Sequence, residues 1–235
     1  MCDLSGEGPH LTPTLSFQER EPVEARSGHR PDFAAGSAND GFDKSEPRNI
    51  ALLARIDTLL AEGARWVWFR ERDMAPEPRA VLARAVLERT HARGAAFTLG
   101  GDAALAAHLG ADGVHLPGGT PPAGIEEARR LLPDGLVGVS AHSVAEVAAA
   151  ARYGADYATL SPIFATASKP GYGPALGPEA IAAACVHGLP VLALGGITPA
   201  TARACREAGA GGIAVMGDLM RSPDPAPTLR ALLSG

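Results

Sequence analysis

Cysteine is scarce in this sequence. The three cysteines among 235 residues, Cys2, Cys185 and Cys205, lie far apart and show no CxxC spacing. Neither a disulfide framework nor a cysteine-based zinc site is therefore indicated. His, Asp and Glu do not cluster at the spacing of metal ligands either. We therefore expect no metal site, and no motif points to a bound cofactor.

Long apolar runs and an excess of positive charge are also absent. No run approaches the ~20 apolar residues of a membrane span, and the N-terminus lacks the layout of a signal peptide. The formal net charge is −5, which argues against a nucleic-acid partner. Apolar residues make up 46% of the chain, enough for a sizeable core. We expect a cytoplasmic protein without membrane or nucleic-acid partners, acting alone or as a homodimer.

The first 48 residues differ from the rest of the chain. Residues 1–48 hold nine acids and five bases, are rich in Pro, Gly, Ser and Glu, and show no sustained apolar period. Such a composition is typical of disorder. We therefore interpret 1–48 as a disordered tail or a mispredicted extension, and 49–235 as the folded domain.

From Ile50 onward the pattern becomes regular, because predicted helices end in Gly-Ala and a short apolar run follows. Strands of four or five apolar residues that alternate with helices predict a parallel α/β sheet covered on both faces. Seven strands are predicted in this region, at 66–69, 96–99, 114–116, 136–139, 157–160, 191–194 and 213–216.

Seven strands are compatible with a doubly wound sheet, whereas a TIM-type (β/α)8 barrel needs eight. The eighth would precede the predicted helix 50–62, where only the poor candidate Asp32-Phe33-Ala34-Ala35 is found. A barrel therefore requires a degenerate or missing first strand.

Two glycine-containing turns follow the last two predicted strands. Gly195-Gly196 precedes a helix, and Met216-Gly217 follows the final strand. Backbone amides at such a turn, together with the helix dipole, favour an anion, and this place is the usual phosphate site of barrels. We expect phosphate binding at Gly195, Gly196, Met216 and Gly217. The alternative is a glycine pair that serves only a tight turn.

Polar side chains are also expected at the carboxyl ends of the strands, where α/β proteins bind ligands. His142 follows the fourth of these strands, next to Ser140, and is a candidate acid–base group. Arg70 and Arg72 share one face of a chain segment and could hold an anion. The alternative for His142 is a histidine that only forms a hydrogen bond to a loop. The alternative for the two arginines is that one or both point outward to the helix layer.

The long segment after Phe164 supplies two more candidates for substrate binding. Thr166 and Lys169 lie there among Ser, Pro and Gly, and barrel loops of this length often cover the active site. The Lys169 ammonium could pair with phosphate or carboxylate; the alternative is a solvated lysine.

Six short segments at the predicted strand ends, in this order and spacing, resemble the thiamine phosphate synthase/TenI superfamily of barrels. The resemblance extends from about Arg65 to Arg221. It is carried by Phe69-Arg70-Glu71-Arg72, residues 110–116 (GADGVHL), 137–143 (VGVSAHS), 154–157 (GADY), 161–171 (SPIFATASKPG) and 194–197 (LGGI).

The superfamily implies two enzymatic reactions. Synthases join a pyrimidine diphosphate to a thiazole phosphate and need magnesium. Their pattern carries a glutamine and two metal-binding aspartates where this chain has Trp68, Gly101 and Thr120. Without the metal, a diphosphate leaving group loses several kcal/mol of charge stabilisation. Synthase activity is therefore the less favoured of the two reactions and remains the alternative.

TenI-type thiazole tautomerases do not need that metal. Their pattern includes Ser-x-His-Ser, as in Ser140-Ala141-His142-Ser143. The resemblance implies that a carboxythiazole phosphate is aromatised by proton transfer, with His142 as the catalytic residue. The expected partner is thus a small phosphorylated thiazole, and Arg70 with Lys169 would meet its carboxylate or phosphate. A further alternative, suggested by the missing first strand, is a non-catalytic phosphate-binding or decayed barrel.

Overall fold

The protein alternates helices and strands through one parallel sheet. The structure, a computed structural model, describes residues 47–71, 73–165 and 174–234. Residues 1–46 of the proposed tail, with the segment Asp32-Phe33-Ala34-Ala35, lie outside these residues, whereas Pro47 and Arg48 of that tail belong to the first helix. The elements are α1 (Pro47–Ala61), β1 (Trp66–Phe69), α2 (Pro76–Ala92), β2 (Ala96–Gly100), α3 (Ala103–Leu109), β3 (Gly113–Leu116), α4 (Pro122–Leu131), β4 (Leu136–Ala141), α5 (Val144–Arg152), β5 (Tyr157–Leu160), α6 (Pro178–Cys185), β6 (Val191–Leu194), α7 (Pro199–Glu207), β7 (Gly212–Ala214), α8 (Gly217–Arg221) and α9 (Ala226–Ser234).

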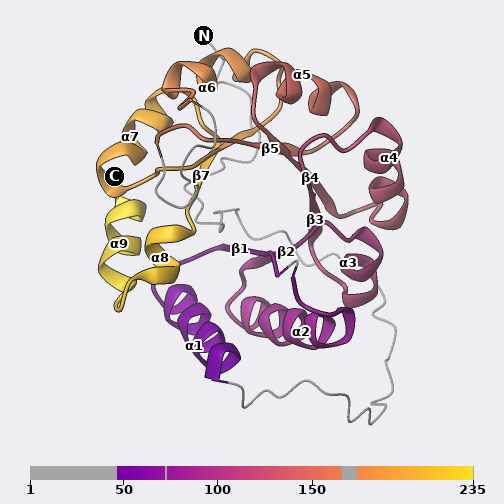
Figure 1. The fold of residues 1–235 in the computed structure, drawn as a ribbon, viewed down its shortest axis with the longest axis vertical. Helices are drawn as coiled ribbons and strands as arrows, with labels where there is room; N and C mark the ends of the chain where they lie inside the picture. Colours follow the sequence, from indigo (N-terminus) through magenta and orange to yellow (C-terminus); the bar gives the residue numbers. More distant parts are fainter. Residues whose placement is uncertain (1–46, 72, 166–173, 235) are drawn as a thin grey trace.

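The seven strands pair in parallel in the order in which they occur, from β1 to β7. The sheet curls so that the helices form a ring outside it, which is the TIM-type arrangement (Figure 1). Within the described residues no strand precedes α1, and β1 and β7 are the two edges of the sheet. The described residues therefore form a curled, seven-stranded parallel sheet of the TIM type, and the expected place of the first strand, before α1, lies outside them.

The predicted strands are confirmed with small shifts at their ends. The last one is β7, which ends at Ala214, so Val215 and Met216 belong to the following loop. All five Gly-Ala junctions that connect a helix to a strand have a positive φ at the glycine, which closes the helix without a steric penalty. These glycines are Gly63, Gly94, Gly110, Gly154 and Gly209.

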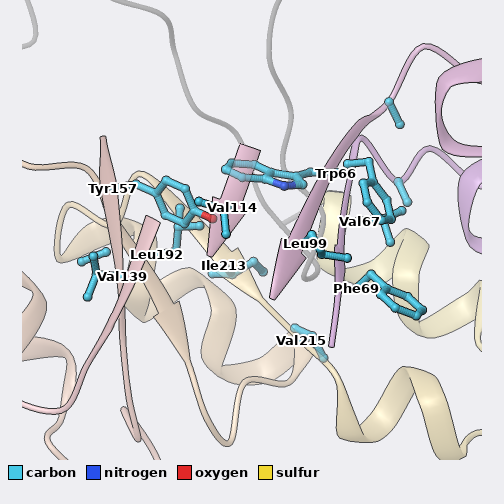
Figure 2. Close-up of a cluster of buried hydrophobic side chains, with 14 of the residues drawn as sticks. Trp66, Val67, Phe69, Leu99, Val114, Val139, Tyr157, Leu192, Ile213 and Val215 are labelled. Carbon is cyan, nitrogen blue, oxygen red and sulfur yellow. The ribbon is translucent and has the colours of Figure 1, made fainter. Parts of the chain in front are cut away.

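Alternating residues of each strand face the barrel interior and the helix layer. The outer positions are aliphatic or aromatic and join the helices in the core, for example Val67, Phe69 and Val114 (Figure 2). The interior positions of β1 to β5 are unusually polar for buried sites. Five polar or amphipathic side chains there are almost fully buried: Trp66, Thr98, His115, Tyr157 and Thr159.

In each of two Gly-Ala-Asp segments, the aspartate accepts a hydrogen bond from the backbone amide of a neighbouring strand. The Asp112 carboxylate accepts a 2.7 Å hydrogen bond from the Phe97 amide, and Asp156 accepts one of 2.6 Å from the Val137 amide. Arg129 lies 2.5 Å from the same Asp156 oxygen, and His91 lies 2.8 Å from Asp112. These aspartates therefore have a structural role at the amino ends of the strands.

Asp156→Ala is expected to lower the free energy of unfolding by about 2 kcal/mol and Tm by about 6 °C. The Val137 amide loses its carboxylate acceptor, and Arg129 keeps only its bonds to backbone carbonyls. Thermal unfolding followed by circular dichroism measures the effect. Asp134→Ala, which changes an exposed aspartate just before β4, is the control. If the two variants melt alike, the carboxylate does not stabilise the strand.

Candidate functional site

A cavity of about 840 Å³ opens at the carboxyl ends of the strands. Arg70, Ser140 and His142 line it, together with the glycine-containing turns after β6 and β7. The structure thus brings together every predicted site residue that it describes: Arg70, Ser140, His142, Gly195, Gly196, Met216 and Gly217. The predicted residues Arg72, Thr166 and Lys169 lie outside the described residues.

The tautomeric state of His142 is set by a backbone group. Its Nδ1 lies 2.9 Å from the carbonyl oxygen of Ser161, which follows β5. A carbonyl oxygen only accepts hydrogen bonds, so Nδ1 carries a proton and the neutral imidazole has its lone pair on Nε2. Nε2 faces Gly118, where an added Cβ would lie 3.4 Å from it. Of its two ring nitrogens, His142 therefore presents Nε2 to the cavity wall at Gly118.

The loop that carries His142 is held by the start of α5. The Ser143 hydroxyl accepts a 3.2 Å hydrogen bond from the Glu146 amide, as a capping box predicts. The Glu146 carboxylate, however, accepts from the His142 amide at 2.6 Å rather than closing the box on the Ser143 amide. Sequence reasoning missed Glu146 as a residue of the site. It lines the cavity and fixes the backbone of the candidate base.

The turn after β6 requires glycine at two successive positions. Gly195 and Gly196 have φ of 91° and 65°, a region that L side chains rarely adopt. An added Cβ would lie 2.9 Å from Pro162 Cα at the first position and 2.6 Å from the Ala165 carbonyl oxygen at the second. The expected tight turn is thus present. It also brings the β5 and β6 loops together at the edge of the cavity.

Trp68, which replaces the glutamine of the synthase pattern, also lines the cavity. Its ring packs on His115, with centroids 4.0 Å apart, and the Arg70 guanidinium carbon lies 5.9 Å from the centre of the same ring. A Cβ at Gly100 would lie 3.1 Å from the indole nitrogen of Trp68. The glycine therefore makes room for the large ring, and the indole forms part of the cavity wall.

The described residues do not supply the donors of a magnesium site. The two positions that carry aspartates in the synthase pattern are Gly101 and Thr120, and the Thr120 hydroxyl donates to the Pro117 carbonyl oxygen at 2.7 Å. Three of the described acids line the cavity: Glu71 pairs with Arg48 at 2.8 Å, the Glu146 carboxylate accepts from the His142 amide, and Asp218 lies 3.8 Å from the Arg221 guanidinium. Across the described ranges, no three His, Cys, Asp or Glu side chains gather as metal ligands. These residues do not fit the metal that the synthase reaction needs.

None of the helices in the described part of the chain is both long and apolar enough to cross a membrane.

Comparisons with known proteins agree with this architecture. A family model described as thiamine monophosphate synthase matches residues 42–219. A "putative thiamine-phosphate synthase" of Geobacter sulfurreducens is 39% identical over 195 residues, which cover 82% of this chain and 90% of that protein. A thiamine-phosphate synthase of Methanoculleus marisnigri is also 39% identical, over 182 residues, covering 77% and 84% of the two chains.

The same family is found among solved structures. A thiamine phosphate pyrophosphorylase from Pyrococcus furiosus matches with a TM-score of 0.69 and 26% identity, covering 77% of this chain and 87% of that one. Together with the family model and the two relatives, this match shows that the chain belongs to the thiamine phosphate synthase/TenI family of thiamine-biosynthesis barrels.

Proposed function

We propose that this protein is a thiazole tautomerase, which aromatises a carboxythiazole phosphate by proton transfer. The observation that carries the proposal is the hydrogen bond between His142 Nδ1 and the Ser161 carbonyl oxygen. With Nδ1 bonded to this carbonyl, Nε2 is the ring nitrogen that can accept a proton at the cavity, which is the arrangement a general base needs.

The reaction balances with His142 as the only proton carrier. Nε2 removes the proton from the ring carbon that bears the carboxylate, and the electron pair moves through the ring toward the exocyclic double bond. The imidazolium then returns a proton to the exocyclic carbon, so one proton leaves and one is added. Because the product gains aromaticity, the protein has chiefly to position the substrate and exclude water.

The other lining groups suit the two anionic ends of this substrate. The turns at Gly195-Gly196 and Met216-Gly217 lie where barrel enzymes bind phosphate. Arg70 and Ser140 line the same cavity and would meet the carboxylate. Arg72, Thr166 and Lys169 remain candidates for the same role.

Thiamine-phosphate synthase is the second candidate, because relatives that are 39% identical carry that name. Both reactions use a phosphorylated thiazole, so the two candidates share a phosphate site. They differ in the need for magnesium and a pyrimidine diphosphate. Gly101 and Thr120 argue against the synthase, since neither supplies a carboxylate for the metal, and Trp68 replaces the glutamine of the synthase pattern.

An experiment by ¹H NMR distinguishes the tautomerase from the synthase. The exocyclic-alkene tautomer is incubated with the protein and no added metal, and we expect aromatisation faster than in the buffer blank. A parallel sample contains thiazole phosphate, the pyrimidine diphosphate and magnesium. Thiamine phosphate in that sample, without tautomer turnover in the first, would overturn the proposal in favour of the synthase. Inactivity in both samples by folded protein would leave a non-catalytic barrel.

A further inference from the structure

A chain of hydrogen bonds crosses the barrel interior beneath the cavity. Trp66 Nε1 lies 3.0 Å from the Thr98 hydroxyl, and Thr98 bonds the Tyr157 hydroxyl. Tyr157 Oη lies 2.9 Å from His115 Nδ1, and His115 Nε2 lies 3.0 Å from Ser140 Oγ. The first four side chains are at most 4% exposed, whereas Ser140 lines the cavity. The network therefore connects a dry interior to the proposed substrate site.

The donors and acceptors in this chain can be assigned step by step from its buried end. An indole N–H only donates, so the Thr98 oxygen accepts from Trp66 and its own proton is available to Tyr157. Burial raises the pKa of Tyr157 above its ordinary value, so the phenol keeps its proton. If Thr98 donates to the phenol oxygen, the phenol proton is available to His115 Nδ1, 2.9 Å away.

The same direction continues to the cavity. A neutral His115 that accepts at Nδ1 carries its proton on Nε2. That N–H is within hydrogen-bond distance of Ser140 Oγ at 3.0 Å, with Thr159 Oγ1 further away at 3.4 Å. The Ser140 oxygen thus accepts from the histidine, and the Ser140 proton is directed to another acceptor.

We propose that His115 is a positioning residue that holds Ser140 as a hydrogen-bond donor to an anionic oxygen of the substrate. The identity of that substrate rests on the proposed function, but the direction of the network does not. His115 lies on β3 and is fully buried against the interior side chains of β1 and β5. It therefore does not touch the reacting atoms.

The tautomer of His115 tests the proposal without any substrate. In protein labelled with ¹⁵N-histidine, long-range ¹H–¹⁵N spectra are expected to show His115 with its ring proton on Nε2 and not on Nδ1. Tyr157→Phe removes only the hydroxyl and should shift His115 away from that tautomer. Thr98→Val, which removes the donor to the phenol, should do the same if the first variant does not fold. A wild-type His115 protonated on Nδ1 would overturn the proposal.

A double-mutant cycle tests the connection to Ser140. Titration calorimetry measures the Kd of the aromatic carboxythiazole phosphate. We expect Ser140→Ala and Tyr157→Phe each to weaken binding by about tenfold. The double variant should bind no more weakly than Ser140→Ala alone, because Tyr157 acts through Ser140.

Thr159→Val, which removes a more distant hydroxyl from the same histidine, should leave the Kd unchanged. Independent, additive losses would show a merely structural role for Tyr157. If the wild-type protein binds but does not turn over substrate, the proposed function fails and this inference stands.

Discussion

His142→Asn is expected to lower kcat for the aromatisation by about 10²- to 10⁴-fold, the usual contribution of a general acid–base group. The asparagine amide can still donate a hydrogen bond toward the Ser161 carbonyl oxygen, which His142 Nδ1 contacts at 2.9 Å. It offers no basic nitrogen in place of Nε2. The substitution therefore removes proton transfer while it retains the loop contact, and the NMR assay of aromatisation measures the loss.

The affinity for the product shows whether His142→Asn removes only the base or also damages the binding site. The Kd of the aromatic product, measured by calorimetry, should change less than threefold in His142→Asn, because the turns after β6 and β7 are untouched. His187→Asn, which alters a histidine in the turn after α6, is the matched control and should keep wild-type kcat. Retained kcat in His142→Asn would remove His142 from the mechanism. A Kd that rises together with the loss of kcat would instead assign His142 to binding.

The strands were predictable because their signals are local. A helix that ends in Gly-Ala and a four-residue apolar run can be read within about ten residues of sequence, and the barrel follows from their regular alternation. The positions of Gly195-Gly196 and His142 at the cavity follow from the rule that ligands bind at the carboxyl ends of parallel strands. For these elements, no contact between distant residues had to be known.

The contacts that give the site its chemistry were not predictable in this way. The acceptor of His142 Nδ1 is a backbone carbonyl 19 residues away, and His115 and Tyr157 are separated by 42 residues. His142 and Ser161 meet because β4 and β5 are neighbouring strands, and His115 meets Tyr157 across Gly138 of the strand between them. Glu146 illustrates the same limit at short range, since its partner is one residue away from the one that a capping box predicts.

Gly138→Ala is expected to lower the free energy of unfolding by about 3 kcal/mol and Tm by about 10 °C. Gly138 lies opposite Tyr157 in the pairing of β4 and β5, and an added Cβ would lie 2.0 Å from the ring carbon Cζ. The ring is nearly fully buried and packs edge-on against Trp66, with centroids 4.9 Å apart, so it has little room to move. Thermal and denaturant unfolding measure the loss.

A second substitution, at Tyr157, tests whether the tyrosine ring is the reason that alanine is not accepted at position 138. Tyr157→Leu deletes the atoms that an alanine at 138 would meet, at the cost of the Tyr157–His115 hydrogen bond. In the Tyr157→Leu background, Gly138→Ala should therefore cost at least about 1 kcal/mol less than in the wild type, a coupling typical of residues in direct contact. Equal costs in both backgrounds would mean that backbone freedom, rather than the tyrosine ring, requires glycine at 138. A positive coupling would show that β4 carries a glycine there so that the buried tyrosine can reach His115.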